Sequence, residues 1–130
     1  MLTNDILSER IAKVREAKRE KLNKLATSIL NKIDENFEHG NFTIDEEGHG
    51  LTTDITMAFM SSLYTDKDDS SYVTYMDQYS PIIGNIIRDT RGFFSVEIRK
   101  MSAIPLEGIP PIGVAIKYEI KIVPNIKEKG

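Results

Sequence analysis

The sequence predicts an α+β fold in which a long N-terminal helix is followed by ββαββ, with one antiparallel sheet covered on one face by helices. Three patterns support this prediction. Residues 4–38 contain neither proline nor glycine and carry apolar side chains at helical spacing. Residues 51–59 and 114–122 alternate in the manner of half-buried strands. Residues 71–90 return to helical spacing and provide a second helix.

The first helix is expected to span residues 4–38. Asn4 or Asp5 can cap its start, and Gly40 follows its end, where glycine commonly terminates helices. A broad apolar stripe marks its second half, which we expect to dock on the core: Leu22, Leu25, Ala26, Ile29, Leu30, Ile33 and Phe37.

The first half of this helix has a thinner stripe of Leu7, Ile11 and Val14, and Lys18 stands where the next apolar residue is expected. A helix of this length spans roughly 50 Å, more than the width of a domain of this size. We therefore expect the first half to project from the body of the protein.

The middle of the chain leaves one alternative open. Residues 51–63 fit a strand, but a helix capped at Thr53 or Asp54 would also place apolar residues on one face. The strand interpretation makes residues 46–50, EEGHG, the connection of a β-hairpin. The helix over 71–90 can begin or restart at Ser80-Pro81 and is expected to end at Gly92.

Two strands, expected at residues 93–101 and 114–123, close the chain around a long connection of residues 102–113. We expect a single domain, 1–130, with its α+β core at 41–123 and a frayed tail at 124–130. The connection between the two strands contains three prolines and four large apolar residues, Ile104, Leu106, Ile109 and Ile112.

Composition excludes several classes of site. The chain has no cysteine, which rules out disulfides and thiolate zinc sites. No apolar run approaches the ~20 residues of a membrane-spanning helix, and the N-terminus lacks the apolar core of a secretory signal. The expected location is therefore the cytoplasm of a cell or of a virus-infected host, without a membrane partner.

Both histidines lie in residues 39–50, HGNFTIDEEGHG, together with three acidic residues. Glu46, Glu47 and His49 are weak candidates for metal ligands, whereas His39 and His49 are too far apart in an extended strand to share an ion. A polar turn is the favoured interpretation. Because no nucleophile motif or phosphate-binding loop is present, we expect neither an enzyme nor a cofactor.

Charge is distributed unevenly along the chain. Residues 10–24 contain seven basic and two acidic residues, a net charge of +5, whereas residues 40–79 contain eight acidic residues and one lysine, a net charge of −7. The basic segment suggests a nucleic-acid-binding module acting through Arg15, Lys18, Arg19 and Lys21. The acidic segment equally allows pairing within one molecule or between copies.

Exposed apolar surface favours a different function. Leu7, Ile11 and Val14 on the helix, with the isoleucines and Leu106 of residues 102–113, predict binding to another protein or self-association into a homo-oligomer. The order of elements resembles that of small subunits of viral tails and head–tail connections, without a shared motif. This resemblance implies a viral structural or accessory subunit.

Overall fold

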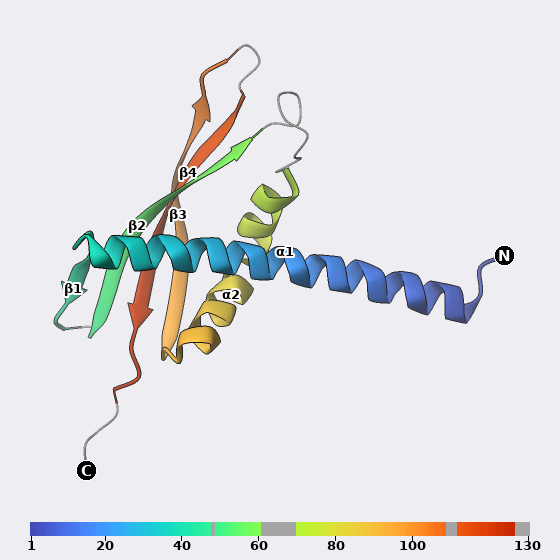
Figure 1. Cartoon of the computed structure of the whole chain (residues 1–130), viewed down its shortest axis with the longest axis horizontal. Coiled ribbons are helices and arrows are strands. Elements are labelled where there is room, and N and C mark those ends of the chain that lie inside the picture. Colours follow the sequence, from blue (N-terminus) through green and yellow to red (C-terminus); the bar gives the residue numbers. More distant parts are fainter. Residues whose placement is uncertain (48, 61–69, 109–111, 127–130) are drawn as a thin grey trace.

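The computed structural model describes residues 1–47, 49–60, 70–108 and 112–126 (Figure 1). Its strands form one antiparallel sheet in the order β1-β2-β4-β3. The predicted α+β class, with a long first helix and ββαββ order, is confirmed. The elements are α1 (Asn4–Glu38), β1 (Thr43–Asp45), β2 (Gly50–Met60), α2 (Ser70–Arg91), β3 (Ser95–Leu106) and β4 (Gly113–Val123).

Helix α1 has the predicted length but a different N-cap. The cap is Thr3, whose side-chain oxygen accepts a hydrogen bond from the backbone N–H of Ile6 at 3.3 Å, so the predicted cap at Asn4 or Asp5 is wrong. Gly40 follows the last turn with φ +73°, a left-handed conformation that glycine adopts without a steric penalty.

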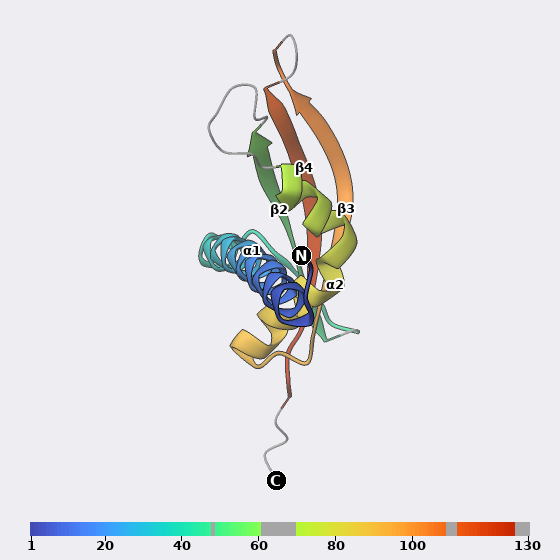
Figure 2. The ribbon, with the colours of Figure 1, turned by 90° about the vertical axis from the view of Figure 1, so that its right-hand side faces the viewer.

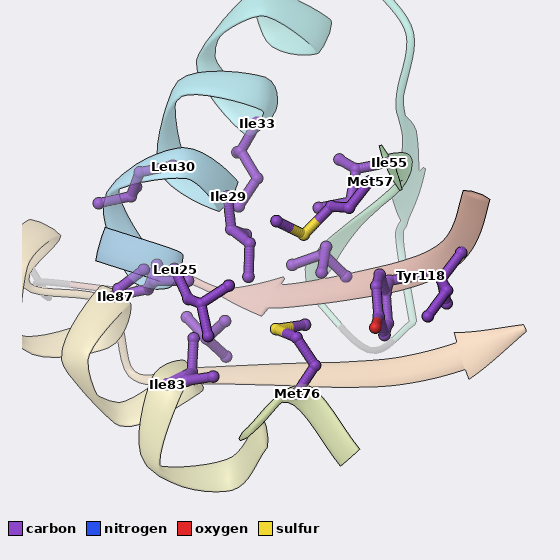
Figure 3. Packing of buried hydrophobic residues seen from close by; sticks show 14 of the residues in the cluster. Leu25, Ile29, Leu30, Ile33, Ile55, Met57, Met76, Ile83, Ile87 and Tyr118 are labelled. Atoms are coloured by element: carbon purple, nitrogen blue, oxygen red, sulfur yellow. The ribbon is translucent and has the colours of Figure 1, made fainter. Parts of the chain in front are cut away.

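Both helices cover the same face of the sheet (Figure 2). α1 crosses the strands in Figure 1, and its second half packs with α2 on the alternate residues of β2 and β4 that point toward the helices (Figure 3). Ile29, Ile83, Ile87 and Ile120 lose all solvent exposure there. This shared core stabilises the docked half of α1 by burial of apolar area.

Residues 50–60 form a strand, which resolves the strand–helix alternative for residues 51–60; residues 61–63 lie outside the described part of the chain. β2 pairs in register with β4 from Leu51↔Ile122 to Met60↔Gly113. Its short partner β1 pairs across the predicted hairpin, with Asp45 opposite Gly50. Hydrogen bonds join β2 to α1: the Asn36 side-chain amide donates to the Thr53 hydroxyl at 2.9 Å and to the Asp54 carbonyl at 2.7 Å.

Helix α2 bends where the sequence predicts a restart. Tyr79 has non-helical angles (φ −122°, ψ 18°), and Pro81 lies in the turn that follows, where its missing N–H costs least. The end of α2 is tied to α1 by Arg91, whose guanidinium donates to both carboxylate oxygens of Asp34 at 2.8 and 2.5 Å. Gly92 then ends the helix with φ +70°.

Strand β3 is longer than the sequence predicts. Ser102–Leu106 was expected to belong to the loop, but these residues pair with β4 as far as Leu106↔Gly113. A bulge between Lys100 and Ser102 inserts Met101 and shifts the alternation by one residue. The alternation of apolar and polar residues is therefore broken at the bulge, although the strand itself continues to Leu106.

Candidate protein-binding surface

The first half of α1 extends beyond the sheet and α2 (Figure 1). The side chains from Asn4 to Ala17 are exposed, and Leu22 is the first buried residue of the helix. We call Leu7, Ile11 and Val14 the apolar stripe; they retain 44%, 42% and 69% of their solvent exposure. A helix in water gains most of its stability from packing, and in the described structure this half has no packing partner.

The apolar stripe continues the face of α1 that contacts α2. Steps of four and three residues lead from Val14 to Lys18, Lys21 and the buried Leu25, so all lie on one side of the helix. The Lys18 ammonium lies 3.8 Å from the ring centroid of Tyr79 in α2. The stripe therefore begins where this helix–helix contact stops.

The four predicted nucleic-acid-binding residues have different surroundings. Lys18 lies over Tyr79, and Lys21 donates to the Ser71 hydroxyl at 3.1 Å. Lys21 also lies 5.7 and 5.8 Å from two tyrosine ring centroids of α2. Arg19 pairs with Glu16 at 3.4 Å, whereas Arg15 has no ion-pair partner among the described residues. Two of the four cations thus form a cation–π contact with α2, which sequence reasoning missed.

The missed signal is the tyrosine spacing in α2. Tyr72, Tyr75 and Tyr79 recur at three- and four-residue steps and present their rings to α1. A lysine that interrupts an apolar stripe can be accommodated when its ammonium lies over an aromatic face. These pairs are separated by about fifty to sixty residues in sequence, so local spacing alone does not predict them.

The predicted apolar residues of 102–113 lie elsewhere on the molecule. Ile104 keeps 63% of its exposure, and its pairing with Ala115 places it on the sheet face opposite the helices. Leu106 shares that face and is partly buried, as is Ile112; Ile109 lies outside the described residues. In Figure 1 this end of the β3–β4 hairpin is remote from the projecting end of α1. The structure therefore separates the two predicted sets.

The rest of that open sheet face is mostly polar, and two ion pairs cross it. Lys117 lies 3.5 Å from Asp54, and Arg99 lies 3.3 Å from Glu119. These cross-strand pairs neutralise four of the charged side chains on that face within the protein. Ile104 is a large apolar side chain that stays well exposed on this face.

The region of both histidines forms the polar turn that the sequence favours. The backbone N–H of Glu47 donates to the Asp45 carboxylate at 3.1 Å, and His49 adopts a left-handed conformation with φ 54°. His39 lies at the end of α1, with its Nδ1 2.7 Å from the Glu35 carbonyl. Glu46, Glu47 and His49 are exposed, and within the described part of the chain no three His, Cys, Asp or Glu residues are placed to hold a metal ion.

Tyr118 is an unusual polar group in the core. Its ring is buried and its hydroxyl has no hydrogen-bond partner among the described residues. Burial raises the pKa of the Tyr118 phenol to about 12, and the negative charge of Asp77 adds to the shift. The phenol is therefore neutral at physiological pH. A cavity of about 170 Å³ beside it is also lined by Ser80 and Lys100.

Comparisons with known proteins add no family to this picture. No protein-family model matches the chain, and no curated protein or solved structure matches it significantly. Within the described ranges, neither helix combines the length and apolar character needed to cross a bilayer.

Proposed function

We propose that this protein is a non-enzymatic protein-binding or assembly subunit that presents the first half of α1 to a helix of another polypeptide chain. The apolar stripe carries this proposal. Leu7, Ile11 and Val14 are exposed on a helix that leaves the body of the protein, and they continue a face that already packs against α2. Contiguous exposed apolar surface of this kind is typical of protein interfaces.

The stripe alone provides a limited binding energy. Fully burying an aliphatic side chain contributes about 1.5–3 kcal/mol, and the stripe residues still expose between 42% and 69% of their surface. The three residues therefore contribute about 2–5 kcal/mol. Association costs at least about 4 kcal/mol in lost translational and rotational freedom. A stable complex thus needs additional contacts beside the stripe or several copies of the interface.

The nucleic-acid alternative has weaker support. Lys18 and Lys21 are engaged with α2, and the protein as a whole is acidic, with a pI of about 5.4. Net negative charge opposes association with a polyanion at long range. Arg15 and Arg19 remain exposed for such contacts.

The absence of cysteine allows a direct test. We would attach an environment-sensitive fluorophore to Ala17→Cys, beside the stripe, and in a control protein to Glu9→Cys, on the opposite side of the helix. The titrants are the unlabelled protein and three amphipathic helical peptides. These peptides share one apolar seam and differ only in flanking side chains, which are glutamate, glutamine or lysine.

At least one titrant should shift the emission at position 17 to the blue and leave position 9 unchanged. Ile11→Asp should abolish the shift, because it places a charge in the buried seam. Ala12→Asp introduces the same charge on an exposed neighbouring position and should preserve binding. The proposed function is wrong if no titrant shifts the emission at position 17, or if Ile11→Asp binds as tightly as the unmodified stripe.

A further inference from the structure

We infer that the partner of α1 is an amphipathic helix of a different chain, with acidic side chains flanking its apolar residues. This inference rests on the proposed function and specifies its partner. It follows from the charges on either side of the apolar stripe, which the stripe residues themselves do not reveal.

Of the four positions that flank the stripe, two carry a positive charge and none carries a negative charge. When Leu7, Ile11 and Val14 form the seam of a heptad pattern, the flanking positions are Ser8 and Arg15 on one side and Arg10 and Ala17 on the other. All four are exposed.

Neither flanking arginine is neutralised within the described structure. The nearby carboxylates lie on the far side of α1 and pair there: Glu9 lies 4.0 Å from Lys13, and Glu16 lies 3.4 Å from Arg19. Arg10 and Arg15 have no ion pair with any described residue. Two unpaired guanidinium groups therefore border the apolar surface that binding would cover.

A second copy of the same helix does not complement these charges. In a parallel pair, the flanking position of Arg10 meets that of Arg15 in the other copy, which brings like charges together. In an antiparallel pair neither arginine meets an acid, because no flanking position of the stripe carries one. Self-pairing thus gathers four arginines around the seam, and like-charge contacts across an interface oppose association.

Carboxylates on a partner helix supply the missing contacts. Guanidinium groups form charge-assisted, often bidentate hydrogen bonds with carboxylates. Such pairs at the edge of an apolar seam increase the association rate, select the partner and weaken as salt screens them. They are also the additional contacts that a stripe of three apolar residues requires.

The test compares the three peptides on the protein labelled at Ala17→Cys. At about 20 mM salt the glutamate peptide should bind about fivefold more tightly than the glutamine peptide, and the lysine peptide should bind more weakly than both. At about 500 mM salt these differences should largely disappear. The double substitution Arg10→Glu and Arg15→Glu should reverse the order.

A matched control reverses two cations that face away from the stripe, with Lys13→Glu and Arg19→Glu. This control changes the net charge equally and should preserve the order of the peptides. The inference is overturned if the glutamine or lysine peptide binds as tightly as the glutamate peptide, or if reversing Arg10 and Arg15 leaves the order unchanged.

Two other occupants are separate outcomes of the same assay. Tighter binding of the unlabelled protein than of any peptide would assign the stripe to a second copy. Phosphatidylserine vesicles are added to the assay as a fifth titrant, and a larger shift with them than with the glutamate peptide would assign the stripe to a membrane surface. Either result overturns the inference. If no titrant binds, the proposed function itself fails, so the two failures can be distinguished.

Discussion

Replacing the same residue with alanine in the two halves of α1 should have very different effects. Ile29 has no solvent exposure and points into the core between the sheet and α2 (Figure 3), whereas Ile11 keeps 42% of its exposure on the projecting half. The substitutions Ile29→Ala and Ile11→Ala remove identical atoms from one helix. Any difference between them therefore reports what each half packs against.

The expected magnitudes follow from burial. Ile29→Ala removes three buried carbon groups at about 0.8 kcal/mol each and leaves a cavity, so unfolding should become easier by about 3–4 kcal/mol. Ile11→Ala removes contacts only with its own helix, and the higher helix propensity of alanine offsets part of that loss. Its net effect should stay below about 1 kcal/mol.

Urea unfolding followed by circular dichroism measures both free energies, and the experiment should be repeated at several protein concentrations. If Ile11→Ala lowered the free energy of unfolding by as much as Ile29→Ala, this reasoning would be refuted. If that cost is independent of concentration, the first half of α1 docks on its own body. If it grows with concentration, the helix is already buried against a second copy.

Three further predictions concern contacts that hold α1, α2 and the sheet together. Lys18→Ala should lower the free energy of unfolding by about 0.5–1 kcal/mol in urea titrations, because it removes the cation–π contact with Tyr79, whereas Lys13→Ala should have almost no effect. The Arg91 guanidinium lowers the pKa of Asp34 through its hydrogen bonds. The stabilisation from Asp34 is therefore complete above its unfolded pKa of about 3.9 and is lost as pH falls through the lower folded value. Its magnitude should be at most about 1 kcal/mol because both side chains are about 40% exposed. Asp34→Asn should remove this acid dependence from unfolding curves measured below about pH 4, and an unchanged dependence would assign it to other carboxylates. Tyr118→Phe should raise the free energy of unfolding by about 0.5–1 kcal/mol, because it removes a buried hydroxyl without a hydrogen-bond partner. A loss of stability in thermal or urea unfolding would show that this hydroxyl is paired.

The elements that sequence patterns predicted are those whose signals are local. The stripe from Leu22 to Ile33, the alternation of β4 and the glycine after α1 each depend on neighbouring residues. Phe37, which was expected to dock with that stripe, keeps 60% of its exposure and stacks on Phe42 instead of entering the core, so that part of the prediction is wrong. The restart of α2 near Pro81 is local as well, because proline disrupts the preceding turn directly. Such features follow from the preferences of a short segment in water.

The features that were not predicted depend on distant partners. Met101 shifts the alternation of β3 only because β4 holds the strand in register on both sides of the bulge. In the sequence, Lys18 interrupts the apolar stripe of the helix without an evident reason. The fold supplies the reason, because it places the Tyr79 ring against the Lys18 ammonium. The candidate surface was predicted in its helical part, at Leu7, Ile11 and Val14. Its separation from Ile104, which strand pairing places on the sheet face opposite the helices, required knowledge of the sheet.

Because α1 is one continuous helix, its projecting first half is held rigidly by the second half, which is docked on the body of the protein. No proline or glycine interrupts Asn4–Glu38, so the docked turns near Leu25 fix both the distance and the direction of the stripe. Each added residue between Val14 and Lys18 would turn the stripe by about 100° around the helix axis. Seven added residues would nearly restore its direction and carry it about 10 Å farther from the sheet. The number of residues in α1 thus sets the distance and the direction at which a bound partner is held from the sheet.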